Sequence, residues 1–353
     1  MNYIVIMAGG VGSRFWPAST EERPKQFLDI LGIGKSLLRL TYERFSQLVP
    51  TTHIYVITNE RYRQLVAADL PELSDRQILG EPSRNNTGPC VAYAAFKLEA
   101  LDQEANLVIA PSDHFIAQEG KFLDVIQHGM EFTSDNDAIL TLGMQPTRPA
   151  TGYGYVELGE RLTAKDEQYP IHKVMAFKEK PDENTAKDYI ESGSYVWNSG
   201  LFIFRASTIL KGFERQSPQI FEILQLGSQY YNTSQEQTFL EEWYPQTENI
   251  SVDYAIMERA DNIYCLPADF GWTDLGSWKA LYDHIGKDSE GNVVLGDNIQ
   301  MVASKHNMIS SIPGKRVIIG GLEHYIVIDD EHGLLIYPLG KEQEIKALQK
   351  NWK

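Results

Sequence analysis

The sequence predicts an α/β fold, in which a mixed, mostly parallel sheet carries helices on both faces and a small β domain follows at the C-terminus. Short apolar runs alternate with runs of helical spacing in the N-terminal part of the chain, and this alternation is typical of parallel strands joined by helices. The segment 292–337 is instead rich in Val, Ile and Gly, with Pro-Gly and Gly-Gly turns, which indicates short strands. In such parallel sheets a ligand binds beyond the carboxyl ends of the strands.

The first strand is predicted at 3–8, because this run is short, apolar and nearly uncharged, as in a strand buried on both faces. The elements predicted after it are strands at 53–58, 106–110, 172–177 and 200–204, helices at 36–48, 60–70, 90–101 and 279–285, and a helix-rich stretch over 207–242. We predict a large domain over 1–286. Residues 287–353 are predicted to form the small β domain, closed by a helix at 341–350.

The composition excludes several classes of protein. The chain has 353 residues with 32 Lys and Arg against 48 Asp and Glu, so its net charge of -16 argues against a surface that binds nucleic acid. Only Cys90 and Cys265 occur, far apart, which favours neither a disulfide framework nor a zinc site. No apolar run is long enough to span a membrane, and no charged segment precedes the first apolar run. We therefore expect a cytoplasmic protein that binds neither nucleic acid nor a membrane.

A glycine-rich turn follows the first strand directly. After Ala8 it contains Gly9, Gly10, Gly12 and Ser13, and glycines there let backbone N–H groups approach an anion. The residues after the turn match neither a Walker loop, which ends in Gly-Lys-Ser/Thr, nor the dinucleotide fingerprint, which needs a third small residue. A turn with a purely structural role remains the alternative.

Two cations flank the loop that follows this turn. Arg14 and Lys25 lie on either side of Pro17 and Pro24, which stiffen the loop by fixing φ. Such a pair suits a triphosphate, since Arg grips phosphate through two hydrogen bonds, although generic surface cations would look the same. The spacing is more specific: Gly-Gly-x-Gly-x-Arg, then Pro-Lys-Gln-Phe ten residues after that Arg, resembles the signature of sugar-nucleotide pyrophosphorylases. The whole stretch 7–28 resembles the mannose-1-phosphate guanylyltransferase family.

The resemblance extends over nearly the entire chain, as far as the segment 321–329. It implies a Rossmann-like fold of the nucleotidyltransferase type A kind, with 1–286 as the catalytic domain and GTP as the nucleotide. The residues it assigns to the nucleotide are Ala8, Gly9, Gly10, Gly12, Ser13, Arg14, Lys25, Glu81, Asn86, Thr87, Ser112 and Asp113.

Two carboxylates follow apolar segments and are candidate metal ligands. Asp113 comes just after the predicted strand 106–110, where its carboxylate could hold Mg²⁺, a cation that prefers oxygen ligands. The alternative is an Asx-turn or a helix cap. Asp274 precedes the predicted helix 279–285 and could be its N-cap. The family resemblance implies that both residues bind a catalytic Mg²⁺. For His114 we expect a structural role, since no second His or Cys lies nearby in the sequence.

The segment 81–89 resembles the loop with which the family contacts its nucleotide, but it departs from the family pattern at two positions. Asn85 stands directly before the Asn-Thr pair where members carry a basic residue, and Arg84 lies one place earlier. Gly88 replaces the usual Ala. These departures leave open how the base is contacted, although Arg84 could supply the same charge.

A second group of residues resembles the family's sugar-phosphate site. Lys180 can serve the phosphate, while Glu179 and Asn198 can serve sugar hydroxyls, although a Glu-Lys pair is usually a solvated surface pair. Asp253, in the segment 251–258, is a further candidate for a sugar contact. The full set is Gly152, Tyr153, Gly154, Glu179, Lys180, Asn198, Gly200 and Asp253.

The resemblance implies transfer of GMP from GTP to α-D-mannose 1-phosphate, which gives GDP-mannose and pyrophosphate. A phosphate oxygen of the sugar phosphate would attack the α-phosphorus in line, with no need for a general base. The expected catalytic residues are Arg14 and Lys25, which hold the triphosphate, and Asp113 and Asp274, which hold Mg²⁺ between the reacting phosphates. Lys180 would attract the sugar phosphate.

Two other functions stay open at this point. A guanylyltransferase for another sugar 1-phosphate, such as fucose or a heptose, would show the same residues. A non-catalytic sugar-nucleotide-binding regulatory protein would keep the fold, but all four expected catalytic residues are present here. The longer bacterial form of the family carries a cupin-type isomerase domain that this sequence does not reach, so we expect guanylyl transfer without isomerase activity. The oligomeric state also stays open: members of the family are often dimers, and the apolar C-terminal β segment could form the interface of a homodimer.

Overall fold

The computed structural model describes residues 1–10, 12–162 and 168–350, and its contacts divide the chain into two compact units. Unit 1 contains Met1–Gly9, Tyr42–Pro111 and Ile116–Trp272, and unit 2 contains Gly10–Thr41, Ser112–Phe115 and Thr273–Lys353. The units are therefore interleaved along the sequence, and the chain passes between them several times. The boundary expected after residue 286 stays a prediction, since compactness alone does not define a domain that folds by itself.

A nine-stranded sheet forms the centre of unit 1, in the order β3-β2-β1-β4-β9-β6-β10-β8-β7. Its strands run over Asn2–Met7 (β1), Ile54–Asn59 (β2), Ile78–Glu81 (β3), Asn106–Pro111 (β4), Ile139–Met144 (β6), Tyr155–Arg161 (β7), His172–Lys178 (β8), Tyr195–Arg205 (β9) and Ile263–Ala268 (β10). Strands β3, β2, β1 and β4 are parallel, as are β6 and β10. Strand β9 runs antiparallel to both β4 and β6, which makes the sheet mixed. The α/β fold and the strands expected at 3–8, 53–58, 106–110 and 172–177 are confirmed within one or two residues.

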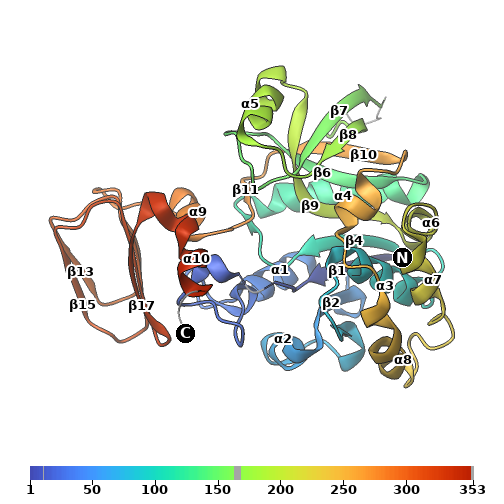
Figure 1. Ribbon diagram of the computed structural model, residues 1–353, viewed down its shortest axis with the longest axis horizontal. Helices are drawn as coiled ribbons and strands as arrows, with labels where there is room; N and C mark the ends of the chain where they lie inside the picture. The colour runs from blue at the N-terminus through green and yellow to red at the C-terminus, as the bar shows by residue number, and fades with distance from the viewer. Residues whose placement is uncertain (11, 163–167, 351–353) are drawn as a thin grey trace. The chain divides into compact units, whose positions relative to one another are not determined.

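Helices cover both faces of this sheet. Successive residues of β1 such as Tyr3 and Ile4 point to opposite faces, and both are buried. Figure 1 shows α3, α6 and α7 gathered beside the β1–β4 half, and their apolar side chains share one core with the sheet. On α4, Gly129 allows a close approach to the sheet, since a Cβ there would lie 2.6 Å from the Cδ1 atom of Ile203. The helices of unit 1 are Arg63–Asp69 (α2), Thr87–Glu99 (α3), Glu119–Asp135 (α4), Glu183–Ser192 (α5), Ala206–Gln216 (α6), Pro218–Gln225 (α7) and Glu236–Trp243 (α8).

Unit 2 combines the glycine-rich loop with the C-terminal β segment around one core. Phe15 of the loop packs edge-on against Trp278, with ring centroids 4.9 Å apart, and Met308 and Ile326 of the β segment belong to the same buried cluster. The elements of unit 2 are α9 (Trp278–His284), β12 (Val293–Leu295), β13 (Ile299–Val302), β14 (Met308–Ser311), β15 (Val317–Gly320), β16 (Tyr325–Asp330), β17 (Gly333–Pro338) and α10 (Ile345–Lys350).

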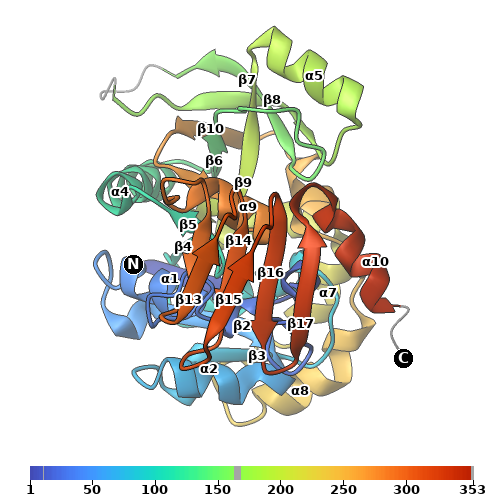
Figure 2. The same ribbon diagram turned by 90° about the vertical axis from the view of Figure 1, so that its left-hand side faces the viewer.

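The C-terminal strands wind into a β-helical coil, in which strands of successive turns pair in parallel, rather than forming an antiparallel meander. Strands β12, β14 and β16 are parallel neighbours, β13 pairs with β15 in parallel, and β17 returns antiparallel to β16. Figure 2 shows these strands running side by side. The expected β-rich C-terminal segment is confirmed. The expected terminal helix begins with a 3₁₀ turn over Leu339–Glu344 and becomes α-helical at Ile345.

Three short or boundary elements complete the chain. Helix α1 (Leu37–Phe45) and the two-residue strands β5 (Phe115–Ile116) and β11 (Trp272–Thr273) lie where the chain passes from one unit to the other. Both cysteines are buried and free. Over the described ranges no helix combines the length and apolar character that a membrane crossing requires.

Candidate active site

The glycine-rich loop begins as soon as β1 ends. Ala8 still belongs to the sheet, because its N–H donates to Ile57 O and its carbonyl accepts from the hydroxyl of Thr58. Gly10 and Gly12 then take positive φ angles of 91° and 67°, where an L side chain is strained. At Gly12 there is a second requirement, since a Cβ would lie 2.6 Å from the Cγ atom of Lys25. Gly12 therefore lets the Lys25 side chain lie against the loop.

Lys25 is the centre of the site in unit 2. Its Nζ lies 2.7 Å from Asp113 Oδ2, and donates to the carbonyl oxygens of Asp274 and Leu275 at 3.3 and 3.1 Å. The aromatic ring of Phe15 lies below the ammonium, with its centroid 5.7 Å away. Three segments that are far apart in the sequence thus meet at one ammonium group, and among them are three of the four expected catalytic residues.

Asp113 is held as a carboxylate by these neighbours. Burial alone would raise its pKa, but the charges of Lys25 and His114 and the hydrogen bond from Lys25 outweigh it, so the pKa lies below its usual value. The preceding residue, Ser112, is buried, and its carbonyl accepts from Thr41 Oγ1 at 3.1 Å. Its own hydroxyl has no partner in the structure, so the site holds a polar group that a ligand or water could satisfy.

Asp274 and Arg14 meet at the turn before α9. The N-cap of α9 is Ser277, whose side chain accepts from Ala280 N, so the helix-cap alternative for Asp274 is wrong. Asp274 Oδ1 instead accepts from Gly276 N at 3.1 Å, and Arg14 Nη1 donates to Gly276 O at 3.3 Å. Between them Leu275 is buried with φ 41°, a strained value for this residue. Both cations of the loop, Arg14 and Lys25, thus donate to backbone carbonyls of the turn 274–276. This turn brings all four expected catalytic residues together.

The oxygen donors of this site fit Mg²⁺. That ion needs only one or two protein carboxylates, because it keeps several waters and binds phosphate oxygens. Asp113 supplies a carboxylate paired with the Lys25 ammonium, and the unsatisfied Ser112 hydroxyl adds a polar oxygen next to it. Asp274 supplies a second carboxylate, on the turn whose backbone carbonyl accepts from the same ammonium. Among the residues that the structure describes, no group of three or more His, Cys, Asp and Glu side chains that could hold a metal ion is found.

The segment after β3 lies in unit 1 and is tied down by its backbone and side chains. Asn86 takes φ 70° and caps α3, with its side chain accepting from Thr87 N. The Thr87 hydroxyl in turn accepts from Val252 N at 2.9 Å. Tyr244 donates its hydroxyl to Glu81, whose pKa burial raises to about 7 in spite of that hydrogen bond.

The two departures from the family pattern both have a structural explanation. Asn85 is buried, and its amide donates to Thr247 O at 2.9 Å and Thr247 Oγ1 at 3.0 Å. Its side chain is thus used to hold the segment after α8. At Gly88 a Cβ would lie 2.7 Å from Ile250 O, so the Ala of other members would not fit here. Arg84 is exposed and donates to the Tyr62 hydroxyl at 2.9 Å.

The expected sugar-side residues also converge, within unit 1, on Asn198 of β9. Its Nδ2 donates to Asp253 Oδ1 at 3.2 Å, and its backbone N–H donates to Gly154 O at 2.8 Å. Its Oδ1 accepts from the N–H of Gly200, which has φ 72° and shapes the chain at this point. At Gly154 a Cβ would overlap the Glu179 carboxylate, so the glycine lets that side chain lie against the backbone.

Like charges gather in this second group. Burial and the nearby Asp253 raise the pKa of Glu179 to about 7, although Lys180 opposes the rise. Burial likewise raises the pKa of Asp253 above its usual value. Asp253 opens a π-helical turn over Asp253–Met257, an irregularity that is frequent at functional sites. The group therefore presents oxygen acceptors whose charge is poorly neutralised.

An aromatic wall adjoins these residues. Tyr153 packs against Trp197 and Trp272, with ring centroids 4.9 and 5.4 Å apart. The Arg148 guanidinium lies 5.7 Å from the Tyr153 centroid. The buried indole N–H of Trp197 has no partner in the structure. Gly152, beside the wall, has open space where a Cβ would be, so a ring could approach the backbone there.

The comparisons with known proteins agree with this geometry. The nucleotidyl transferase family model matches residues 3–291. The chain belongs to the nucleotidyl transferase family. It is 36% identical over 355 residues to the mannose-1-phosphate guanylyltransferase RfbM of Salmonella typhimurium (strain LT2), an alignment that covers 98% of this chain and 71% of the relative. It is also 35% identical to a mannose-1-phosphate guanylyltransferase of Escherichia coli, covering 97% of this chain and 72% of that protein.

The fold agrees with a solved member as well. A crystal structure from Thermus thermophilus, described as a mannose-1-phosphate geranyltransferase, superposes with a TM-score of 0.87 at 30% identity. It covers 99% of this chain and 98% of its own. The resemblance found in the sequence is thereby confirmed, and the long mixed sheet is the nucleotidyltransferase fold.

The structure places two residues beside the sugar-side group that the sequence analysis did not predict. Arg148 and Trp272 were not among the expected site residues, although both lie beside Tyr153. An arginine directly before a Pro and close to the Tyr153 motif was the available signal. The π-helical turn at Asp253 leaves no such signal, because its apolar residues follow ordinary helical spacing.

Proposed function

We propose that the chain transfers GMP from GTP to α-D-mannose 1-phosphate, and so forms GDP-mannose and releases pyrophosphate. The observation that carries this proposal is the convergence of Arg14, Lys25, Asp113 and Asp274 within unit 2. Such an arrangement suits phosphoryl-group chemistry, where catalysis comes from positioning and charge. The substrates follow from the relatives, which carry the name mannose-1-phosphate guanylyltransferase over almost all of this chain.

Arg14 and Lys25 hold the triphosphate in this proposal. The attacking phosphate oxygen of mannose 1-phosphate is already ionised at neutral pH, so no residue needs to remove a proton from it. The two cations neutralise the charge that develops on the departing pyrophosphate, and their carbonyl partners at 274–276 fix them before the substrate arrives. The backbone N–H groups of Gly9, Gly10, Gly12 and Ser13 supply further donors for phosphate in this proposal.

A bound Mg²⁺ would neutralise phosphate charge on GTP, and Asp113 and Asp274 are the residues that would hold it. Asp113 suits this role since its pKa lies below the usual value, which keeps it a carboxylate through the working pH range. Lys25 shares its charge with Asp113, and thereby positions that carboxylate.

The sugar-side group selects the second substrate. Glu179 and Asp253 offer acceptors for sugar hydroxyls, while Asn198 offers both a donor and an acceptor. Lys180 lies close enough to act on both carboxylates and supplies charge for the sugar phosphate. The aromatic face of Tyr153 provides an apolar surface for the C–H side of a hexose ring. The same proposal includes a homodimer formed through the β-helical coil of the C-terminal strands. It also includes the expectation that the protein binds neither nucleic acid nor a membrane.

Release of pyrophosphate tests the function directly. The purified protein is incubated with Mg²⁺, four nucleoside triphosphates and a panel of hexose 1-phosphates that includes mannose, glucose, fucose and a heptose. We expect the highest turnover with GTP and mannose 1-phosphate. A preference for another sugar phosphate would preserve the chemistry and overturn the choice of sugar, whereas binding of sugar nucleotide without any release would indicate a regulatory protein.

A further inference from the structure

A large cavity in unit 2 adjoins the glycine-rich loop. Its volume is about 910 Å³, and residues of the loop, of the β16–β17 turn and of α10 line it. Its lining includes Gly12, Ser13 and Lys346. Gly12 and Ser13 are also expected nucleotide contacts, so the cavity opens onto the same loop as the proposed triphosphate site.

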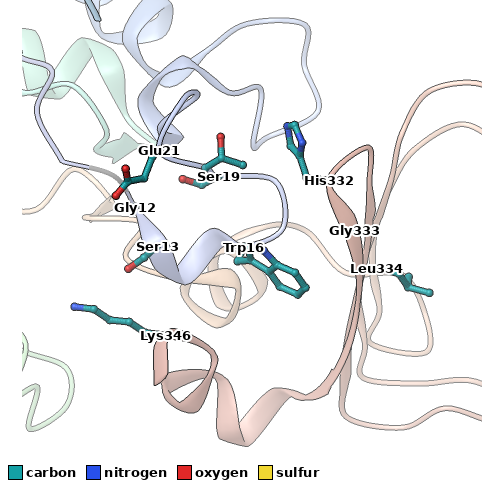
Figure 3. Close-up of a pocket in the computed structure, with 10 residues that line it drawn as sticks. Gly12, Ser13, Trp16, Ser19, Glu21, His332, Gly333, Leu334 and Lys346 are labelled. Carbon is teal, nitrogen blue, oxygen red and sulfur yellow. The ribbon is translucent and has the colours of Figure 1, made fainter. Parts of the chain in front are cut away.

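Lys346 brings an additional cation to this cavity from the C-terminal helix. Figure 3 shows its side chain extending from α10 along the side of the cavity where Ser13 lies. The side chain is exposed. Over the described residues it takes part in none of the ion pairs, whereas Lys25 is paired with Asp113. Within the described part of the chain, no carboxylate therefore neutralises the charge of Lys346.

Charge balance gives Lys346 a role. A nucleoside triphosphate carries roughly three to four negative charges at neutral pH, and this protein has a net charge of -16. Of the two expected phosphate cations, Lys25 is largely compensated by Asp113, and Arg14 already donates to Gly276 O. A further uncompensated cation beside the loop would lower the energy of the terminal phosphates.

We propose that Lys346 is a third phosphate-binding residue, which contacts the β- and γ-phosphates of GTP and the pyrophosphate that leaves. This inference rests on the function proposed above. The C-terminal helix then contributes to the active site, in addition to any role in the stability of the β segment.

The helix does not depend on Lys346 for its attachment. Ile345, the neighbouring residue, is 1% exposed and belongs to the same core as Phe15 and Leu339. Truncation of Lys346 removes only an exposed side chain, so the variant K346A should keep its fold. Lys341, in the preceding 3₁₀ turn, is also exposed and does not line the cavity, so K341A removes the same charge from the same segment as a matched control.

Direct binding tests the inference without reliance on turnover. Calorimetric titration of GTP, inorganic pyrophosphate and GMP into the wild type, K346A, K346R and K341A measures each affinity in the presence of Mg²⁺. We expect K346A to weaken the binding of GTP and of pyrophosphate about tenfold, because the substitution removes one charge-assisted hydrogen bond. GMP has only the α-phosphate and should bind K346A as it binds the wild type. K346R should retain most of the affinity, and K341A should match the wild type.

The outcomes separate this inference from the proposed function. The inference about Lys346 would be overturned if the wild type and K346A bound GTP and pyrophosphate with equal affinity. It would also be overturned if K346A lost as much affinity for GMP as for GTP. The expected binding pattern would support the phosphate contact even if the pyrophosphate assay showed that another sugar phosphate is the substrate. Circular dichroism of each variant confirms that its fold is intact.

Discussion

The two groups of site residues, one in each unit, are built from opposite electrostatic arrangements. In the phosphate cluster (Arg14, Lys25, Asp113 and Asp274), the cations face a carboxylate and backbone carbonyls, and the pKa of Asp113 lies below its usual value. In the sugar cluster (Glu179, Asn198 and Asp253), two carboxylates share an amide, and the pKa of Glu179 rises to about 7. Phosphates need fixed positive charge, whereas sugar hydroxyls need acceptors, and the difference between the clusters follows from those needs.

The largest effect is expected from the centre of the phosphate cluster. K25A removes the ammonium that joins Asp113 to the carbonyls of Asp274 and Leu275. We expect kcat to fall about 10³-fold, since a fixed charge that acts on the transition state is lost. Pyrophosphate release at saturating substrates measures this.

The control for this variant is K121A, which removes an exposed lysine of α4 in unit 1. It should leave kcat unchanged. Thermal unfolding of both variants separates catalysis from stability, and wild-type turnover by K25A would remove Lys25 from the mechanism.

A smaller effect, on binding, is expected from the sugar cluster. D253N keeps an oxygen that can accept from Asn198, but it removes the charge that faces the sugar hydroxyls. We expect the KM for mannose 1-phosphate to rise about tenfold while the KM for GTP is unchanged. Steady-state kinetics with each substrate varied in turn give both values. An equal rise in both KM values would show that Asp253 acts on the fold of the site.

The raised pKa of Glu179 predicts a dependence on pH. Below its pKa of about 7 the group is protonated and accepts hydrogen bonds poorly; above that pH it is a carboxylate. The KM for mannose 1-phosphate should therefore fall several-fold as pH rises from about 6 to about 8. Since the sugar phosphate and Glu81 also titrate in this range, the comparison is with E179Q, whose profile should lose this component. Identical profiles would contradict a role for Glu179 in sugar binding.

The smallest effect on activity is expected outside both clusters. Asn85 stands where the family has a basic residue, but its amide is used on the backbone and hydroxyl of Thr247. N85A should lower the melting temperature by about 3–6 °C through the lost buried hydrogen bonds. The preference for GTP over ATP should not change. Differential scanning calorimetry and the two KM values measure these, and a lost nucleotide preference would show that Asn85 contacts the base.

The sequence was informative where one local rule decides the structure. The apolar run at 3–8 and the glycines after it predicted β1 and its loop, since a buried strand and a positive φ each leave a mark on residue type. The chemistry at Asp113 and Asp274 was also predicted, but from the family resemblance, and the structure then removed the helix-cap alternative for Asp274 by placing Ser277 at the cap.

Features that depend on contacts between distant residues were not predictable. The C-terminal strands form a β-helical coil in which Met308 pairs with Val293 on one side and with Ile326 on the other. The number of residues between the paired positions differs in the two cases, so a search of the sequence for regular repeats does not detect the coil. Trp272 acquires its place beside Tyr153 only in the folded chain. The role of Gly88 follows from the carbonyl of Ile250, which no local pattern reveals.

The division of work between the two clusters can be tested in one experiment. The steady-state rate of pyrophosphate release is measured for the wild type, K25A and D253N as mannose 1-phosphate is raised to saturation, with GTP and Mg²⁺ in excess. We predict that D253N reaches a rate close to that of the wild type at saturation, whereas K25A stays about 10³-fold slower at every concentration. A D253N rate that remains as low as that of K25A would contradict the assignment of catalysis to the phosphate cluster and of substrate selection to the sugar cluster.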